Sequence, residues 1–208
     1  MFSHPINIAV LISGGGTTLQ NLLDAIHAGA LSARVVLVIA SRQGIKGIDR
    51  ATAANLPVQI ISRKDFDSVE TFSDCIFNEC SRAKVDLICL GGWLQLLRMP
   101  EQWIGRVMNI HPSLLPSFGG KGMFGHHVHQ AVLDHGCKIS GCTVHFVDND
   151  YDAGPIVAQH ICETQHDDTA ESLAARVFEL EKIAYPQAIE AHRLGQLKII
   201  GRRVMWTR

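Results

Sequence analysis

The chain has 208 residues, a length that suits one large α/β domain better than two small ones. Hydrophobic residues make up 47% of the sequence and charged residues 19%, which is enough apolar material for a substantial core. The formal net charge is −1 at pH 7, which argues against a bulk electrostatic attraction to nucleic acid or to an anionic membrane and leaves room only for a local basic patch.

The first hundred residues alternate short apolar runs with stretches of helical periodicity. The expected strands lie at residues 8–12, 35–40, 58–61 and 85–90, and the expected helices lie at residues 19–26, 45–56 and 68–82. Strands that are apolar throughout and alternate with helices indicate a parallel sheet that is covered on both faces. We therefore predict a Rossmann-like, doubly wound α/β fold with a mostly parallel sheet, in which the carboxyl ends of the strands share one edge.

The second half of the chain changes character after a fifth strand at Val107–His111. The elements expected beyond it are a glycine-rich loop at 117–125, a short helix at 127–135, two strands at 140–147 and 155–162 joined by a turn, and a long helix from about 169 to 194. We predict that Asp168 caps the long helix, with Glu171 in a capping-box position, and that Pro186 kinks it. No repeat or linker interrupts the sequence, so we expect a single domain that spans residues 1–208.

A run of glycines, residues 14–16, follows the first strand, and Thr17 and Thr18 open the next helix. Glycines let the backbone approach a ligand closely, and the free N–H groups at a helix start favour phosphate. The run is not the dinucleotide fingerprint, because the third glycine of that motif would fall at Leu19 and because Arg42 follows the second strand in place of an acidic residue. The pattern favours a phosphate site, with a tight turn that binds no ligand as the alternative.

Asn109 and His111 stand at the end of the fifth strand, directly before Pro112. Residues two apart on a strand project from the same face. In an open α/β sheet the ligand crevice lies outside the carboxyl ends of the strands. A lone histidine is more often a hydrogen-bonded structural residue, but a polar pair at this edge favours a role in chemistry.

An acidic turn joins the two strands of the second half, where Asp148, Asn149, Asp150 and Asp152 crowd together. Such a turn is commonly no more than a solvated loop. It can also fold over the strand ends and bring one carboxylate beside His111. The residues alone leave both alternatives open.

At these residues the chain resembles the folate-dependent formyltransferases, in particular those that act on glycinamide ribonucleotide. The resemblance covers nearly the whole chain and rests on residues 13–20, on 109–116, and on 141–147 followed by Asp152 and 154–155. The block Asn-Ile-His-Pro with a downstream Asp-x-Gly-Pro turn is specific for folate-dependent formyl transfer, although it does not separate the members of the family. The form of the glycine run and the chain length favour the ribonucleotide enzymes over the related deformylase and the initiator-tRNA formyltransferase.

The resemblance implies that the chain transfers the formyl group of 10-formyltetrahydrofolate, its cosubstrate, to glycinamide ribonucleotide in de novo purine synthesis. The site residues that it implies are the catalytic trio Asn109, His111 and Asp152, then Gly16, Thr17 and Thr18 at the substrate phosphate, Glu181 at the glycinamide end, and Trp93, Leu94, Gln95, Leu96, Leu97, Asp148, Asn149, Asp150 and Tyr151 around the folate. The phosphate site would belong to the half at 1–105, and the catalytic and folate-binding groups to the half at 106–208. No metal, nucleic acid or membrane is implied, and the enzyme would be a monomer or homodimer.

Two positions depart from the family pattern. Gln95 and Val69 stand where the family usually carries arginines that help to hold folate. We expect Arg63, Lys64 or Arg98 to supply the carboxylate contacts instead.

The loop at 117–126 is longer than in the commonest bacterial forms, and its Lys121 is a candidate for a lid or a phosphate contact. The adjacent cluster His126-His127-x-His129 suggests a metal site, but its loose spacing favours an interpretation in which two of the three histidines line the rim of the active site. His145 is expected to be a structural or rim residue.

The remaining signals concern location. The six cysteines form no CxxC pair, and Cys89 lies in an apolar run, a pattern typical of reduced thiols in a reducing compartment. The segment Met1 to Pro5 provides no basic stretch ahead of an apolar one, and no apolar run approaches the length of a membrane span. We expect a cytoplasmic protein.

The implied mechanism is direct transfer through a tetrahedral intermediate, with Asn109 and the imidazolium form of His111 as N–H donors to its oxyanion. Asp152 is expected to orient His111, to favour its protonated form and to relay a proton through water. Two rival hypotheses are a hydrolase that releases formate from the same folate and a non-catalytic nucleotide-binding module. The hydrolase needs neither the phosphate loop nor Glu181, and the module has no use for the trio.

Overall fold

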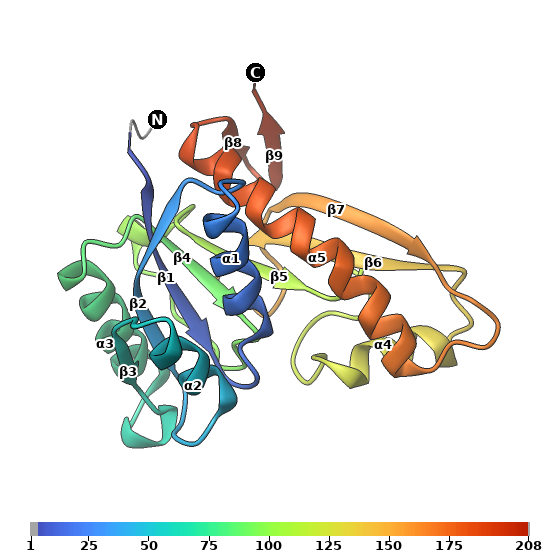
Figure 1. The fold of residues 1–208 in the computed structure, drawn as a ribbon, viewed down its shortest axis with the longest axis horizontal. Helices are drawn as coiled ribbons and strands as arrows, with labels where there is room; N and C mark the ends of the chain where they lie inside the picture. The colour runs from blue at the N-terminus through green and yellow to red at the C-terminus, as the bar shows by residue number, and fades with distance from the viewer. Residues whose placement is uncertain (1–3, 208) are drawn as a thin grey trace.

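The computed structural model of the chain describes residues 4–207, which contain the strands and helices drawn in Figure 1. The strands are β1 (Ile6–Ile12), β2 (Ala33–Ala40), β3 (Val58–Ile60), β4 (Leu87–Gly91), β5 (Val107–His111), β6 (Ile139–Phe146), β7 (Ile156–Glu163), β8 (Leu197–Ile200) and β9 (Arg203–Trp206). The helices are α1 (Thr17–His27), α2 (Lys46–Ala53), α3 (Val69–Arg82), α4 (His126–Asp134) and α5 (Ala170–Arg193), with short 3-10 turns η1 (Arg63–Asp65) and η2 (Glu101–Trp103). The segment at 1–3, which enters the prediction about the N-terminus, lies outside the described residues.

One sheet contains the nine strands of the described residues, in the order β3-β2-β1-β4-β5-β6-β7-β9-β8. The first five strands in this order are parallel, and β6 runs antiparallel to both β5 and β7. Because β1 pairs with both β2 and β4, the chain winds outward in two directions from the middle of the sheet. This confirms the predicted doubly wound, mostly parallel fold, and it places the carboxyl ends of β1, β4 and β5 at one edge.

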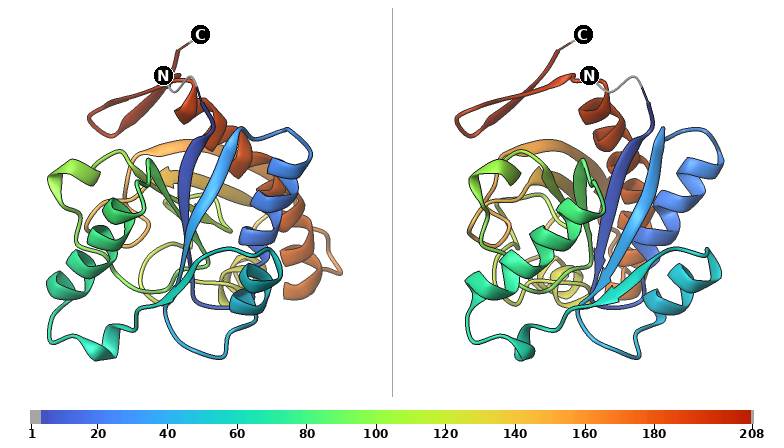
Figure 2. Two further views of the ribbon diagram at one scale, coloured as in Figure 1. Left: turned by 60° about the vertical axis from the view of Figure 1, so that its left-hand side comes forward. Right: turned by 90° about the vertical axis from the view of Figure 1, so that its left-hand side faces the viewer.

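Alternate residues of β1 face opposite sides of the sheet and belong to different cores. Ile8, Val10 and Ile12 pack in a core that includes α1 and α5, whereas Ala9 and Leu11 pack in a core that includes α3. Figure 2 shows α1 and α5 on one side of the sheet and α3 on the other. Burial on both faces explains why the strand is an almost unbroken apolar run instead of an alternating one.

The C-terminal hairpin is a correction to the predicted elements, which end at residue 194. Strands β8 and β9 pair with each other, and β9 joins the sheet beside β7. The indole N–H of Trp206 donates to the Val157 carbonyl at 2.8 Å, which gives this side chain a structural role. The two strands read Leu-Lys-Ile-Ile and Arg-Val-Met-Trp, so they are mostly apolar, but four residues each are too few to show a strand period.

The start of α5 also differs from the prediction. Thr169, not Asp168, is the N-cap, and Ser172 instead of Glu171 completes the capping box: each of the residues Thr169 and Ser172 accepts the other's backbone N–H with its side-chain oxygen. Asp168 instead accepts two hydrogen bonds from the Arg176 guanidinium, at 2.7 and 2.8 Å. Asp168 also accepts from the Ser172 hydroxyl at 2.7 Å, so its carboxylate supports the first turn of α5 through side chains and does not cap its backbone N–H groups.

Helix α5 continues through Pro186 as one element and runs diagonally across the sheet beside α4 (Figure 1). It packs on β6 and β7, so one long helix connects the antiparallel part of the sheet with α1. None of the helices between residues 4 and 207 is both long enough and apolar enough to cross a membrane.

Candidate active site

A cavity of about 580 Å³ lies where the carboxyl ends of the parallel strands meet. Its walls come from the start of α1, the segment after β4, the end of β5 with the loop that follows, and one face of α5. The predicted site residues that line it are Thr17, Thr18, Trp93, Leu94, Asn109, His111, Tyr151, Asp152 and Glu181. A concave site at this edge is where a doubly wound sheet is expected to bind ligands.

Asn109 and His145 face each other as a cross-strand pair of β5 and β6. The His145 Nδ1 atom lies 2.8 Å from the Phe146 carbonyl oxygen, which can only accept, so Nδ1 carries the proton of the neutral ring. Nε2 of His145 then accepts from the Asn109 amide Nδ2 at 3.1 Å, which fixes the orientation of that amide. His145 is therefore a member of the site. The register of β5 against β6 places His145 opposite Asn109, and that register cannot be read from the sequence alone.

Asp152 reaches Asn109 and His111 from the turn between β6 and β7. Its Oδ1 atom accepts from Asn109 Nδ2 at 3.3 Å, and its Oδ2 atom lies 3.5 Å from His111 Nδ1. Oδ2 also accepts from the Gly120 N–H at 2.9 Å. Burial raises the pKa of Asp152, but the polar groups that surround the carboxylate, the Gly120 N–H among them, outweigh this effect and lower the pKa overall. Asp152 is an ionised acceptor at the centre of the cluster.

The turn presents Asp152 through a backbone that few residues can adopt. Asp152 has a φ of 54°, in the left-handed region that aspartate tolerates better than most side chains. A Cβ at Gly154 would lie 1.9 Å from the Phe146 carbonyl oxygen, so only glycine fits there. These two requirements explain the Asp-x-Gly pattern in the sequence.

His111 is 4% exposed and has a partner at each ring nitrogen. Its Nε2 atom donates to the Phe118 carbonyl at 2.8 Å, while Nδ1 faces Asp152. Burial lowers the pKa of His111, and the raising effects of Asp152 and the Phe118 carbonyl offset this only in part. The neutral ring is favoured at neutral pH. Asp152 favours the protonated ring, as expected, but burial of the ring outweighs the nearby carboxylate, so the expected imidazolium is not the resting form.

The loop after β5 is fastened to the sheet by Thr143 of β6. The Thr143 hydroxyl donates to the Ser113 carbonyl at 2.7 Å, and the Ser113 hydroxyl donates to the Ser117 carbonyl at 2.6 Å. These bonds hold the loop in the position from which the next residue, Phe118, meets His111. The polar residues after the Asn-Ile-His-Pro block thus support the site without lining it.

The glycine run before α1 shapes the backbone, and the two threonines that follow it line the large cavity. Gly16 has a φ of 71°, and a Cβ on it would lie 2.6 Å from the Gly47 Cα, so Gly16 permits the close approach of α1 and α2. Thr17 and Thr18, which follow it, line the large cavity at the start of α1. The Arg50 side chain donates to the Gly15 carbonyl at 2.9 Å and holds the run from outside.

Helix α5 forms the wall that faces the start of α1. Phe178 and Glu181 line the cavity one turn apart, and the Tyr185 hydroxyl donates to the Met108 carbonyl at 2.8 Å, which ties this part of α5 to β5. Burial raises the pKa of Glu181 to about 8. Within the described residues the Glu181 carboxyl group has no hydrogen-bond partner, so it is available to a ligand.

A second, small cavity of about 40 Å³ adjoins the trio on the other side of Trp93. Of the residues predicted around the folate, those that line it are Trp93, Gln95, Leu96, Leu97, Asp148, Asp150 and Tyr151. Asn149 lines neither cavity. Its Oδ1 atom accepts from the Met99 N–H at 2.8 Å and its carbonyl from Arg98, so Asn149 anchors the turn to the segment before η2.

The three neighbouring histidines lie in different surroundings. His126 lies 3.3 Å from Glu171 on α5, and the His127 ring packs against Phe124. His129 alone lines the large cavity, and its Nδ1 atom is buried without a partner. Burial lowers the pKa of His129 to about 4. Within residues 4–207 no group of three potential metal ligands is present, and one histidine of the three, rather than two, reaches the site.

Comparison with known proteins gives a match along most of the chain. The family model described as formyl transferase matches residues 6–189. Phosphoribosylglycinamide formyltransferase of Haemophilus influenzae is 36% identical over 194 residues, which cover 92% of this chain and 89% of that protein. The trifunctional purine biosynthetic protein adenosine-3 of Drosophila melanogaster is 44% identical over 186 residues, which cover 88% of this chain. The chain spans only 13% of that trifunctional protein's length and 20% of its Bos taurus counterpart's.

Solved structures agree with this match. Glycinamide ribonucleotide transformylase 1 from Symbiobacterium toebii superposes with a TM-score of 0.91 at 38% identity, over 99% of this chain and 96% of that one. A formyltetrahydrofolate deformylase from Pseudomonas syringae superposes with a TM-score of 0.85 at 21% identity, over 99% of this chain and 67% of that one. The second likeness shows a shared fold alone.

Proposed function

Since the chain belongs to the formyl transferase family, we propose that it transfers the formyl group of 10-formyltetrahydrofolate to the amine of glycinamide ribonucleotide. The observation that carries this proposal is the buried cluster of Asn109, His111 and Asp152 on the floor of the large cavity, opposite the unpartnered Glu181. The cavity provides room for an acceptor between the start of α1 and α5, and the residues expected around the folate line the small adjoining cavity beside Trp93.

In the proposed reaction the neutral amine attacks the formyl carbon and an oxyanion develops. Asn109 Nδ2 donates to that oxyanion in exchange for its bond to Asp152, which at 3.3 Å is the longer of its two bonds. Such a donor is worth about 2.7–4 kcal/mol of barrier in measured oxyanion holes. The bond to His145 stays in place and keeps the amide oriented.

His111 is the second N–H donor to the oxyanion, and its neutral ring carries one proton for this purpose. Its Nε2–H is directed to the Phe118 carbonyl, so donation to the oxyanion requires that this contact be exchanged for the substrate. The growing negative charge beside the ring then favours its protonation. Asp152, ionised and close to both, holds the water that carries a proton from the attacking amine to the departing folate nitrogen. The carbon–nitrogen bond to folate breaks as the intermediate collapses.

The acceptor is oriented from both of its ends. Thr17 and Thr18 place hydroxyl and N–H groups at the start of α1, where a phosphate is favoured. Lys121 lines the same cavity and is the nearest candidate for a further phosphate contact. Glu181 receives the amine end, and N–H donors of the acceptor beside it lower the raised pKa of Glu181 and favour its carboxylate form. The halves at 1–105 and 106–208 thus contribute to one site.

The test is transfer itself. The full chain is incubated with 10-formyltetrahydrofolate, with and without glycinamide ribonucleotide, and the change in folate absorbance is followed. We expect a change that depends on the amine. Formate release at the same rate without the amine would make the protein a hydrolase, and no change under either condition would refute both activities.

A further inference from the structure

The turn at residues 147–155, which we call the Asp152 turn, carries its carboxylate on a demanding backbone. Asp152 has a φ of 54°, and a residue other than glycine keeps such a left-handed conformation only where its surroundings hold it. On its N-terminal side the turn is fastened by Asn149, whose side chain accepts from the Met99 N–H at 2.8 Å. The C-terminal side of the turn needs an anchor of its own.

Arg202 provides that anchor. Its Nη2 atom donates to the Ala153 carbonyl oxygen at 2.8 Å, one residue beyond Asp152. Within residues 4–207 no other side chain bonds to a backbone group of residues 152–155. Since Ala153 is joined directly to Asp152, a fixed Ala153 carbonyl limits how far the Asp152 backbone can rotate.

Arg202 belongs to the C-terminal hairpin, and the pairing of that hairpin explains how it meets the Asp152 turn. The residues at 201–202 form the two-residue turn between β8 and β9. Directly after it, Arg203 pairs with Ile156, the first residue of β7 beyond the Asp152 turn. This register brings the tip of the hairpin to the point where the Asp152 turn ends, and the Arg202 side chain reaches back from there to Ala153.

The hairpin is itself fixed to the body of the protein. The Trp206 indole bonds to the Val157 carbonyl of β7, and the Ile199 side chain packs against Gly105, which follows η2. The residues at 201–202 also line a cavity of about 290 Å³ whose other walls come from the segment before η2 and from the Asp152 turn. Because the hairpin is held in these places, its tip is a rigid support for the turn.

We propose that Arg202 is a positioning residue for the transfer: by holding the Ala153 carbonyl, it keeps the Asp152 carboxylate against Asn109 and His111. This inference rests on the proposed function. Arg202 lines neither the large cavity nor the small one, so it acts through the Asp152 turn and not on a substrate. The hairpin lies beyond residues 6–189, the part of the chain that the family model matches, so membership of the family assigns no role to it.

The test removes the guanidinium and keeps the length of the side chain. In Arg202→Met the Ala153 carbonyl loses its donor. We expect kcat to fall about tenfold, because a displacement of a catalytic group by about 1 Å costs up to about 10²-fold and Asn149 still holds the other side of the turn. KM for glycinamide ribonucleotide should not change, since the walls formed by α1 and α5 are untouched. Arg202→Lys retains an N–H donor and should recover part of kcat.

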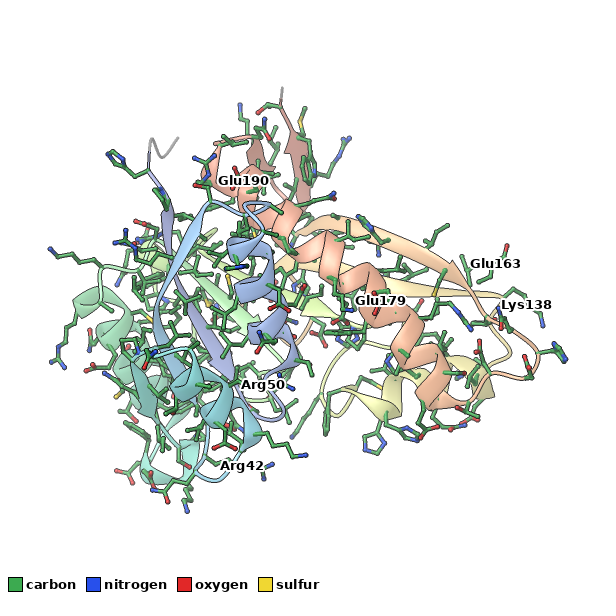
Figure 3. All side chains as sticks on the ribbon, in the orientation of Figure 1. Arg42, Arg50, Lys138, Glu163, Glu179 and Glu190 are labelled. Carbon is green, nitrogen blue, oxygen red and sulfur yellow. The ribbon has the colours of Figure 1, made fainter. Side chains whose placement is uncertain are left out.

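Two controls separate the hydrogen bond from the charge and from the hairpin. Arg203→Met changes the next residue of the same hairpin, whose exposed side chain forms no hydrogen bond or ion pair within residues 4–207. Lys138→Met removes an exposed cation that Figure 3 shows at the far end of β6 and β7 from the hairpin. Both controls should keep kcat. Unchanged kcat in folded Arg202→Met, or an equal loss of kcat in Arg203→Met, would overturn the inference.

A readout without chemistry separates this inference from its premise. The Asp152 carboxylate lies 3.5 Å from His111 Nδ1 and 3.6 Å from His145 Nε2, so its displacement changes the ring ¹⁵N NMR signals of both histidines. We expect these signals to shift in Arg202→Met and to stay in place in Arg203→Met. Shifted signals in a chain that transfers no formyl group would refute the proposed function and leave the effect of Arg202 on Asp152 intact. Unshifted signals in an active chain would refute the positioning role alone.

Discussion

The two sides of the large cavity are built in opposite ways. On the β5 side, Asn109, His145 and Asp152 are joined by hydrogen bonds, and Asp152 is also held by the Gly120 N–H. On the side of α4 and α5, the Glu181 carboxyl and the Lys121 ammonium form no hydrogen bond or ion pair within the described residues. The polar groups on the β5 side have hydrogen-bond partners within the protein, whereas Glu181 and Lys121 on the other side, which we call the α5 side, have none within the described residues.

This difference separates two tasks. A catalytic group must be in position before the reaction, so that little reorganisation is needed when charge develops. A group that recognises a ligand gains its partner from that ligand, and an unpaired polar group on a cavity wall is costly until then. The β5 side therefore suits chemistry and the α5 side suits recognition. Substitutions on the two sides should affect different kinetic constants.

The largest expected effect comes from Asp152→Asn, which removes the charge that joins the β5 side. We expect kcat to fall about 10²- to 10⁴-fold, since proton transfer by a positioned group contributes that much. Asn109 also loses a charged acceptor, and the carboxylate beside the His111 ring disappears. Steady-state kinetics with both substrates, together with circular dichroism, provide the check. Asp167→Asn, an exposed carboxylate in the loop before α5, is the matched control. Wild-type turnover in folded Asp152→Asn would remove this residue from the mechanism.

A smaller effect is expected at His145, which acts through Asn109. His145→Ala should lower kcat about 10-fold or more with little change in KM, because the Asn109 amide loses the acceptor that orients it. His145→Gln retains an acceptor oxygen and should recover part of the loss. A purely structural role for the ring would instead lower the melting temperature of both variants equally and give no recovery of kcat.

The sequence predicts the parallel half of the fold well, because β1, β2 and β4 are almost unbroken apolar runs that a serine or a glycine ends. It also places Asn109 and His111 at the edge where the parallel strands end. Asp152 is predicted only through the family resemblance, because the residues alone do not distinguish it from a solvated turn. The sequence does not predict β8 and β9, which are mostly apolar but have only four residues each, too few to show a period. The stability of those strands comes from pairing with β7 and from Trp206, which are contacts between distant segments.

The sequence shows which residues belong to the site more readily than it shows what surrounds each of them. The side chain of His145 reads as an alternating strand residue, and only the register of β5 against β6 places it opposite Asn109. The neutral state of His111 likewise depends on how deeply its ring is buried. A carboxylate nearby suggests an imidazolium from the sequence, but the cost of burying a charged ring is visible only in the folded structure.

The smallest expected effect tests the α5 side through stability. Burial raises the pKa of Glu181 from 4.5 to about 8. As the pH rises above 4.5, the unfolded chain releases a proton that the folded protein keeps, so Glu181 destabilises the fold progressively until the pH passes about 8. Glu181→Gln resembles the protonated group at every pH. Its melting temperature should therefore match that of the unchanged protein in acid and exceed it by a growing margin up to about pH 8, where the margin levels off.

Thermal unfolding followed by circular dichroism across this pH range measures that margin. Glu163→Gln, whose exposed carboxyl group (Figure 3) forms no ion pair within the described residues, is the control and should show no margin that rises toward pH 8. If the curve for Glu181→Gln ran parallel to that of the unchanged protein, Glu181 would ionise in the folded state as it does in the unfolded one. The carboxylate would then already be stabilised without a ligand, and the contrast between a satisfied β5 side and an unpartnered α5 side would fail at its central residue.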